Sequence, residues 1–173
     1  MRRLSALVLT VLLLAGLSAC GSSGGTGDTP DAGSVSSLDT TCPAHPTESF
    51  AKTKFVAHVG LAAGSFHRWI YRPYRAGTFA KGAHGRTFAL IKAGATALFV
   101  SHELKAAIAS VRSSPRLCGL LIKPMSRLSG LFDGLKGNLT SGNLGGVAGI
   151  QSTLAGVMST AARNGAAVTE QSN

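Results

Sequence analysis

The chain has 173 residues, with 17 lysines and arginines against 7 aspartates and glutamates, which gives a net charge of +10. This length allows one domain with its own hydrophobic core. So few acidic residues argue against catalysis by a pair of carboxylates. Beyond the N-terminal segment, the longest apolar stretch, residues 88–100, is interrupted by Lys92 and falls short of the ~18 residues that a membrane-spanning helix needs.

The N-terminus has the pattern of a secretion signal. Two arginines precede an apolar run over residues 4–17, which is too short to be a spanning helix. The run ends in Leu17-Ser18-Ala19-Cys20, which resembles the lipobox of bacterial lipoproteins. The resemblance implies that residues 1–19 are a lipoprotein signal peptide, that the chain is cut before Cys20, and that Cys20 is acylated. The mature protein would then lie outside the cytoplasm, anchored in the cell membrane by lipid.

The segment after Cys20 is poor in apolar residues. Glycine, serine, threonine and aspartate dominate residues 21–41. Such a segment cannot bury enough surface to offset the conformational entropy lost on ordering. We therefore expect a flexible tether over residues 20–41, a folded domain over residues 42–165, and a disordered tail over residues 166–173.

The first helix is predicted over residues 48–72. Apolar residues recur there three or four positions apart, at Phe55, Val59, Ala62, Phe66, Trp69 and Ile70. Pro73 disfavours helical geometry in the residue before it and is expected to end the helix, with a glycine-rich loop over residues 73–85. Gly60 and Gly64 form a smooth patch, which we expect to allow close packing of this helix inside the bundle.

A second helix is predicted over residues 86–112. Its main apolar stripe consists of Leu90, Ala97, Leu104, Ile108 and Val111. Ile91 and Leu98 widen this stripe, so both should face the core. The residues predicted to be buried are Phe55, Leu98, Leu121, Leu128 and Leu154.

Two more helices are predicted over residues 115–136 and 143–163. Pro124 lies on the apolar stripe of the first of these and is expected to kink or divide it near Leu121. The alternation typical of strands is not sustained anywhere. Four helices with short connections predict an all-α fold, a four-helix up-down bundle.

Cys42 and Cys118 remain once Cys20 carries lipid. Two cysteines in an exported domain most often pair. In an up-down bundle the starts of the first and third helices lie at the same end, where these two residues would meet. We therefore expect one disulfide. Two free thiols at a metal or redox site are the alternative, but the close spacing typical of such sites is missing.

The stretch 49–102 combines basic and aromatic residues: it holds eight lysines and arginines, no acid, and nine of the ten aromatics. This composition favours an anionic partner, and outside a cell anionic lipid headgroups or wall polymers come before nucleic acid. Arginine offers paired donors to phosphate, and tyrosine suits a boundary between apolar and wet surroundings. The predicted anion- or membrane-surface-binding residues are Arg68, Tyr71, Arg72, Tyr74, Arg75, Lys81 and Arg86. Phe66 and Trp69 are expected to belong to the core, and charge that serves only solubility is the alternative for the rest.

Other chemistry finds little support in the sequence. His102-Glu103 resembles the start of a zinc-binding helix, but Ala106 stands where the second histidine should be. No serine lies in a G-x-S-x-G elbow. We therefore expect no metal, no cofactor and no assignable catalytic residue. Glu103, the one acid in a basic neighbourhood, is expected to pair with a neighbouring helix.

Residues 42–118 resemble small exported proteins of actinobacteria that have no assigned activity, through the segments 50–55, 69–74 and 88–105. The resemblance implies an exported, helical body and no particular activity. The sequence predicts a non-enzymatic, membrane-anchored lipoprotein that binds anionic envelope material through its basic aromatic surface. The alternatives are a protein-interaction module that uses the glycine-rich helix 143–163, and an unrecognised hydrolase.

Overall fold

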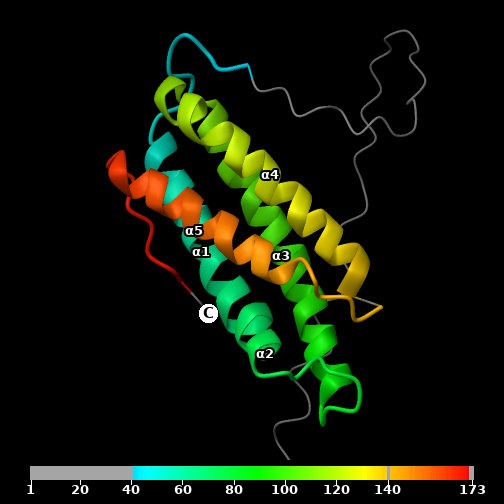
Figure 1. Ribbon diagram of the computed structural model, residues 1–173. Coiled ribbons are helices and arrows are strands. Elements are labelled where there is room, and N and C mark those ends of the chain that lie inside the picture. Colours follow the sequence, from blue (N-terminus) through cyan, green and yellow to red (C-terminus); the bar gives the residue numbers. More distant parts are fainter. Residues whose placement is uncertain (1–40, 140, 172–173) are drawn as a thin grey trace, which may run out of the picture. The chain divides into compact units, whose positions relative to one another are not determined.

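The computed structural model describes residues 41–139 and 141–171, which form a helical bundle (Figure 1). The elements in chain order are α1 (Ala51–Phe66), the π-helical turn η1 (His67–Tyr71), α2 (Arg72–Arg75), α3 (Arg86–Arg112), α4 (Pro115–Leu139) and α5 (Val147–Arg163). The described residues contain no β-strand, so the predicted all-α class is confirmed. The predicted signal peptide, the lipobox with Cys20 and nearly all of the predicted tether lie outside the described residues.

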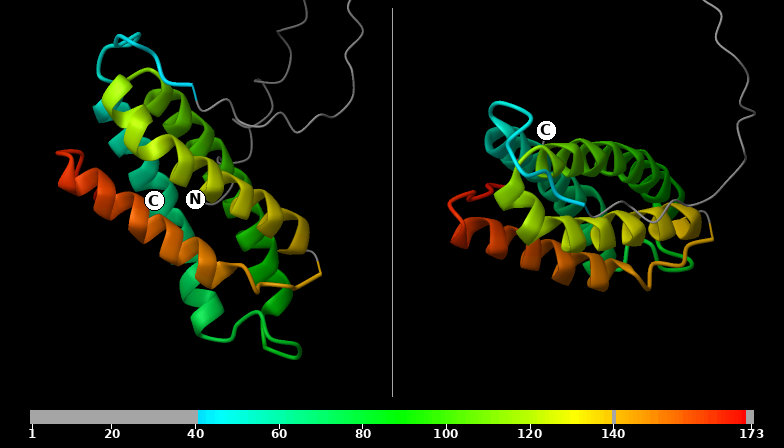
Figure 2. Two further views of the ribbon diagram at one scale, coloured as in Figure 1. Left: turned by 45° about the horizontal axis from the view of Figure 1, so that its top comes forward. Right: turned by 90° about the horizontal axis from the view of Figure 1, so that it is seen from above.

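Long helices that follow one another in the chain also lie side by side. The helix α1 packs on α3, α3 packs on α4, and α4 packs on α5, as two further views show (Figure 2). The rings of Phe66 on α1 and Phe132 on α4 meet edge to face, with centroids 5.4 Å apart. Four of the five predicted core residues are buried, namely Phe55, Leu121, Leu128 and Leu154.

Leu98 is 65 % exposed, so its predicted burial is wrong. The buried stripe of α3 holds many small residues, which lets α1 and α4 pack closely against it; it consists of Ala93, Ala97, Val100, Leu104, Ala107, Ile108 and Val111. Ile91 and Leu98 lie on another side of the same helix, and Ile91 is 64 % exposed. The helix therefore has two apolar stripes, of which one faces the core.

The first helix continues past Pro73, contrary to the prediction. Proline lacks an N–H group, and in a regular α-helix its ring clashes with the carbonyl four residues earlier. Here the chain widens into η1, where the N–H of Arg72 donates to the carbonyl of His67, five residues back. Pro73 then falls in the first turn of α2, where a missing N–H group is tolerated. The π turn thus lets the helical path continue to Arg75.

The sequence predicted that Pro124 kinks or divides the helix near Leu121; α4 runs unbroken through Pro124, so it is not divided. It also extends beyond residue 136 to Leu139, whose side chain is buried. The helix α5 begins at Val147 rather than at residue 143, because a turn precedes it. In that turn the N–H of Val147 donates to the carbonyl of Leu144 (3.1 Å).

Cys42 and Cys118 form the predicted disulfide. Their Cα atoms lie 5.6 Å apart, within the range that a disulfide requires. Cys118 lies in the first turns of α4 and is fully buried. The bond thus ties the segment before α1 to the beginning of α4.

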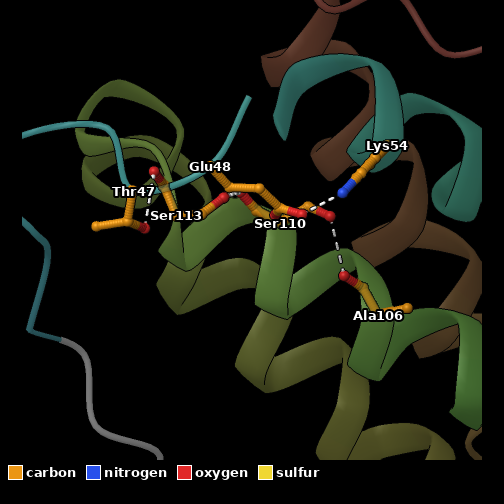
Figure 3. Close-up of polar contacts among 6 residues, drawn as sticks. All are labelled: Thr47, Glu48, Lys54, Ala106, Ser110 and Ser113. Carbon is orange, nitrogen blue, oxygen red and sulfur yellow. Dashed lines mark hydrogen bonds and ion pairs between the residues drawn. The ribbon is translucent and has the colours of Figure 1, made fainter. Parts of the chain in front are cut away.

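Polar contacts fasten the same entry segment to the end of α3 (Figure 3). The N–H of Thr47 donates to the carbonyl of Ser113 (2.9 Å), and the Ser113 hydroxyl donates to the carbonyl of Ser110 (2.9 Å). Glu48 pairs with Lys54 on α1. The hydrogen bond from Lys54 holds the pKa of the Glu48 carboxyl below its ordinary value. The entry segment is thus held by the disulfide and by contacts to two helices.

The C-terminal segment 166–171 lies against α1, which differs from the disordered tail predicted over residues 166–173. Ala166 is 1 % exposed. The N–H of Gln171 donates to the carbonyl of Gly60 (2.9 Å). The carboxylate of Glu170 lies 2.9 Å from Nδ1 of His67. An apolar contact, a backbone hydrogen bond and a side-chain pair therefore hold this segment along α1.

Gly60 and Gly64 receive this segment, and not a neighbouring helix as the sequence predicts. A Cβ atom at Gly60 would lie 2.5 Å from the carbonyl oxygen of Thr169, and one at Gly64 would lie closer still to that of Gln171. The two glycines are therefore needed because backbone approaches backbone, a use of glycine that no other residue can fill without displacing the segment.

Glu103 pairs with a neighbouring helix, as predicted. Its Oε2 atom lies 2.7 Å from Nδ1 of His58, which joins α3 to α1. Glu103 is only 7 % exposed, so this contact provides the carboxylate with the partner that a buried polar group requires.

The core, the disulfide and the tail contacts all lie within the compact unit Ser37–Asn173. A fragment with these residues keeps every interaction described above, since none of them involves an earlier residue. It also lacks Cys20, which leaves Cys42 and Cys118 as its cysteines. This fragment is suited to the solution experiments below.

Candidate functional site

The seven predicted binding residues extend from η1 to the start of α3. Four are exposed, namely Arg68, Arg72, Arg75 and Lys81, and three are half-buried, namely Tyr71, Tyr74 and Arg86. Both tyrosines pack against the core. The ring of Tyr71 lies 5.0 Å from that of His67 and 6.1 Å from that of Phe66, between centroids. Both tyrosines are thus partly buried in the fold, while Arg68, Arg72 and Arg75 reach solvent.

Two cations lie close to the ring of Trp69. The guanidinium of Arg68 is 5.0 Å from the ring centroid, and the ammonium of Lys92 is 4.4 Å from it. The same ammonium lies 4.8 Å from the ring of Phe88. Trp69 is half-buried, so the predicted core position holds only in part. Lys92 therefore links an aromatic residue of η1 to one of α3, in a cation–π cluster that the sequence analysis missed.

The exposed apolar stripe of α3 continues from this cluster. Phe88, Ile91 and Leu98 are 63 %, 64 % and 65 % exposed. Their spacing of three and seven residues puts them on one side of the helix. We call these three residues, with Trp69 and Lys92, the α3 surface. It joins large apolar side chains and a cation on adjoining elements. The signal that could have revealed it was the second apolar stripe of residues 86–112, which the prediction assigned to the core.

A groove of about 560 Å³ lies beside the α3 surface, between α3 and α4. Its apolar lining comes from Leu90, Ile91, Leu98 and Leu139. Two cationic residues, Arg86 and Lys136, also line it. Of the seven predicted residues, only Arg86 is placed there, and its Nε–H donates to the carbonyl of Phe79 (2.9 Å). The groove combines an apolar wall with positive charge.

A second cavity, of about 320 Å³, brings together Arg68 and Arg72 of the predicted set. His67 and Glu170 line it as well, paired with each other. Such a histidine–carboxylate pair also occurs in hydrolases, but this lining holds no serine or cysteine among the described residues. The described residues of this cavity therefore offer positive charge without a nucleophile.

The space between α4 and α5 bears on the predicted interaction module. A cavity of about 530 Å³ there is lined mainly by polar and charged side chains, including Lys123, Arg127, Ser152, Thr153 and Thr160. An interaction module that uses the helix predicted over residues 143–163 would be expected to show an exposed apolar groove along it. This cavity lacks that character.

The described part of the chain holds neither a metal-ligand cluster nor a helix that could span a membrane. Over residues 41–139 and 141–171, no three histidine, cysteine or acidic side chains gather as a metal site would require. Over the same ranges, no helix combines the length and the apolar character needed to cross a membrane.

No protein-family model, no curated protein and no solved structure matches this chain. The features of this chain that indicate a function are therefore the α3 surface, the groove beside it and the N-terminal sequence pattern.

Proposed function

We propose that this chain is an exported lipoprotein whose helical domain binds the anionic surface of the membrane that anchors it. The lipobox-like residues 17–20 support the anchor at Cys20. The α3 surface supports the membrane contact, together with the exposed arginines at positions 68, 72 and 75. In this proposal the chain has no catalytic residue and needs no cofactor.

The observation that carries the proposal is the exposure of Phe88, Ile91 and Leu98 beside a lysine. A group of large exposed apolar side chains on one helix face indicates an interaction site, whereas single scattered ones need no explanation. The ammonium of Lys92 lies over two aromatic rings, and basic residues beside an exposed apolar face suit an anionic interface. The apolar side chains of this surface can thus insert into the acyl layer while Lys92 contacts headgroup phosphate.

A lipid surface fits these residues better than a wall polymer does. A polar polymer would pair with Arg68 and Lys92 but would leave the apolar side chains of α3 without a partner. A membrane interface supplies both an acyl layer and negative charge. A tether of the expected composition, about 25 Å end to end on average, would keep the domain near the bilayer.

We also propose that the four long helices alternate in direction, as in an up-down bundle. The short connection between α3 and α4, residues 113–114, favours antiparallel neighbours. The disulfide supports the same arrangement, because it joins the segment before α1 to the first turns of α4.

The 37–173 fragment is expected to sediment with vesicles that contain phosphatidylglycerol and to bind pure phosphatidylcholine more weakly. Replacing Phe88 and Ile91 together by serine should lower the affinity about tenfold or more, because each side chain loses hydrocarbon burial. Replacing Arg72 and Arg75 together by glutamine should weaken binding several-fold at low salt, since each basic residue near an anionic bilayer contributes about 1 kcal/mol. Raising the salt concentration should reduce the difference in affinity between the wild type and the Arg72/Arg75 variant.

The matched control is Leu120→Ser, which removes another exposed leucine, 45 % exposed, from α4. It should leave vesicle binding unchanged, and far-ultraviolet circular dichroism should show every variant folded. If the wild-type fragment ignores both kinds of vesicle at low salt, the membrane proposal is wrong. Binding to wall polymer under those conditions, or to a partner protein, would then identify the occupant of the α3 surface.

The anchor is tested separately with the full chain, expressed in a bacterium that processes lipoproteins. Replacing Cys20 by alanine should leave an uncut, unlipidated precursor, because acylation takes place on this sulfur. Incorporation of labelled palmitate and the mass of the N-terminus report the outcome. The control Cys42→Ala should be labelled and cut like the wild type. A Cys20→Ala protein that is still cut before residue 20 and still carries label would refute the anchor.

A further inference from the structure

The groove between α3 and α4 has the dimensions of a ligand site. Its volume of about 560 Å³ lies within the range of about 300–1,000 Å³ that small-molecule sites occupy. Among its lining residues, Leu139 is buried and Leu90 is half-buried, while Ile91 and Leu98 are exposed. Gly94 deepens it, since a Cβ atom placed there would meet no other atom within 4 Å.

The polar groups of the groove are mostly cationic. Arg86 is held in place through its Nε–H bond to the Phe79 carbonyl. The ammonium of Lys136 lies 2.6 Å from Oδ1 of Asp133, one turn earlier on α4. The side chain of Asp133 is 51 % exposed, and such exposed pairs hold their partners only weakly. An anionic group can therefore share or take over the ammonium.

We propose that this groove binds one acyl chain of an anionic lipid. The chain would lie against Leu90, Leu98 and Leu139, and the charged head would meet Lys136 and Arg86. The inference deepens the proposed function and rests on it for the source of the lipid, which is the membrane in contact with the α3 surface.

The lining favours a hydrocarbon chain over a peptide. A bound peptide brings backbone N–H and C=O groups, each of which needs a hydrogen-bond partner once it leaves water. Besides the two cations, Thr87 is the residue of the lining with a polar side chain. An acyl chain needs no such partner, and its single charged end matches a groove whose positive charge comes from two residues.

The test is a calorimetric titration of the 37–173 fragment with dodecanoate below its micelle concentration. We expect saturable binding to one site, with butyrate at least about a hundredfold weaker because it lacks most of the hydrocarbon. Dodecyl maltoside carries the same chain without charge and should bind several-fold more weakly than dodecanoate. Methyl resonances of Ile91 and Leu98 should shift during the dodecanoate titration.

Gly94→Leu should fill the groove and weaken dodecanoate binding at least about tenfold. The open space at Gly94 lets the fold tolerate the change. Gly130→Leu is the matched control, since Gly130 is also a helical glycine with open space at its Cβ position but lies on α4 outside the groove lining. This control should bind dodecanoate like the wild type. Lys136→Gln should weaken dodecanoate binding several-fold and leave the binding of dodecyl maltoside unchanged.

The outcomes for the groove and for the membrane surface are separable. If dodecanoate does not saturate a site, or if folded Gly94→Leu binds it unchanged, the groove proposal is overturned even where vesicle binding persists. If dodecanoate binds in the groove but vesicles are ignored, the groove proposal stands and the membrane proposal fails. Equal binding of dodecanoate and butyrate would show a site for anions alone and would also overturn the acyl-chain proposal.

Discussion

Replacing Cys42 and Cys118 together by alanine is expected to lower the free energy of unfolding by about 4 kcal/mol. The two cysteines are 76 residues apart in the sequence. A cross-link over a loop of this length removes many conformations from the unfolded chain, and the loss of the link restores them. Because Cys118 is fully buried, the change to alanine also removes a packed sulfur atom.

Urea denaturation of the 37–173 fragment measures this effect. The double variant should unfold at a clearly lower urea concentration than the oxidised wild type. The wild-type fragment unfolded and refolded with a reductant should approach the midpoint of the variant, while the variant itself should not respond to the reductant. This comparison separates the bond from the lost packing. Equal midpoints for the oxidised and the reduced wild type would show that the disulfide contributes nothing to stability.

The second expected result concerns Gly64, where replacement by alanine should destabilise the fold instead of stabilising it. Replacing a glycine inside a helix by alanine normally stabilises the helix by up to about 1 kcal/mol. At Gly64 the added Cβ atom would collide with the backbone of Gln171. The segment 166–171 must then leave α1, which breaks the hydrogen bond from Gln171 to Gly60 and separates Glu170 from His67. We expect Gly64→Ala to be destabilising by roughly 1–3 kcal/mol.

Hydrogen exchange and urea denaturation of the fragment report on this change. In Gly64→Ala, the amide of Gln171 should lose its protection while the amides of α3 and α4 keep theirs. The matched control is Gly134→Ala, at a helical glycine of α4 with no atom within 4 Å of the new Cβ position, and it should be neutral or stabilising. A Gly64→Ala variant that is as stable as this control, with the C-terminal amides still protected, would show that the segment does not need the glycine.

The candidate site was predicted from the sequence only in part. The basic aromatic composition led to Arg68, Arg72 and Arg75, which are exposed. It did not identify Phe88 or Lys92 as site residues. The ammonium of Lys92 lies over the rings of both Phe88 and Trp69 and so connects α3 to η1. These residues lie many positions from Trp69 in the sequence, so their proximity depends on how η1 packs against α3. Composition can indicate which residue types reach a partner, but it cannot bring residues of two elements together.

Local features of the sequence determined where the long helices lie and where α3 begins and ends. The boundaries 86–112 of α3 were predicted as observed, because apolar periodicity and the Ser-Ser-Pro stop are local features. The disulfide was predicted too, since only Cys42 and Cys118 remained to pair. Pro73 was expected to end a helix, and Pro124 to kink or divide one. At Pro73 the π turn η1 accommodates the proline, whereas α4 runs through Pro124 with Leu121, Ile122 and Met125 buried around it. A proline costs a helix hydrogen bonds and space, and at Pro124 burial of the neighbouring residues can outweigh that cost.

Only the tertiary structure decided how far the inner side of α3 extends. The sequence named a main stripe of which Ala97, Leu104, Ile108 and Val111 are buried, but its periodicity could not separate Ile91 and Leu98 from that stripe. The stripe with Ala93 and Ala97 faces α1 and α4, because small residues let helices approach closely and bury more atoms. Ile91 and Leu98 are left on the outside by that choice. The same physical reason places the segment 166–171 on α1: two glycines one turn apart leave room for a backbone, and no local pattern reveals which backbone will use it.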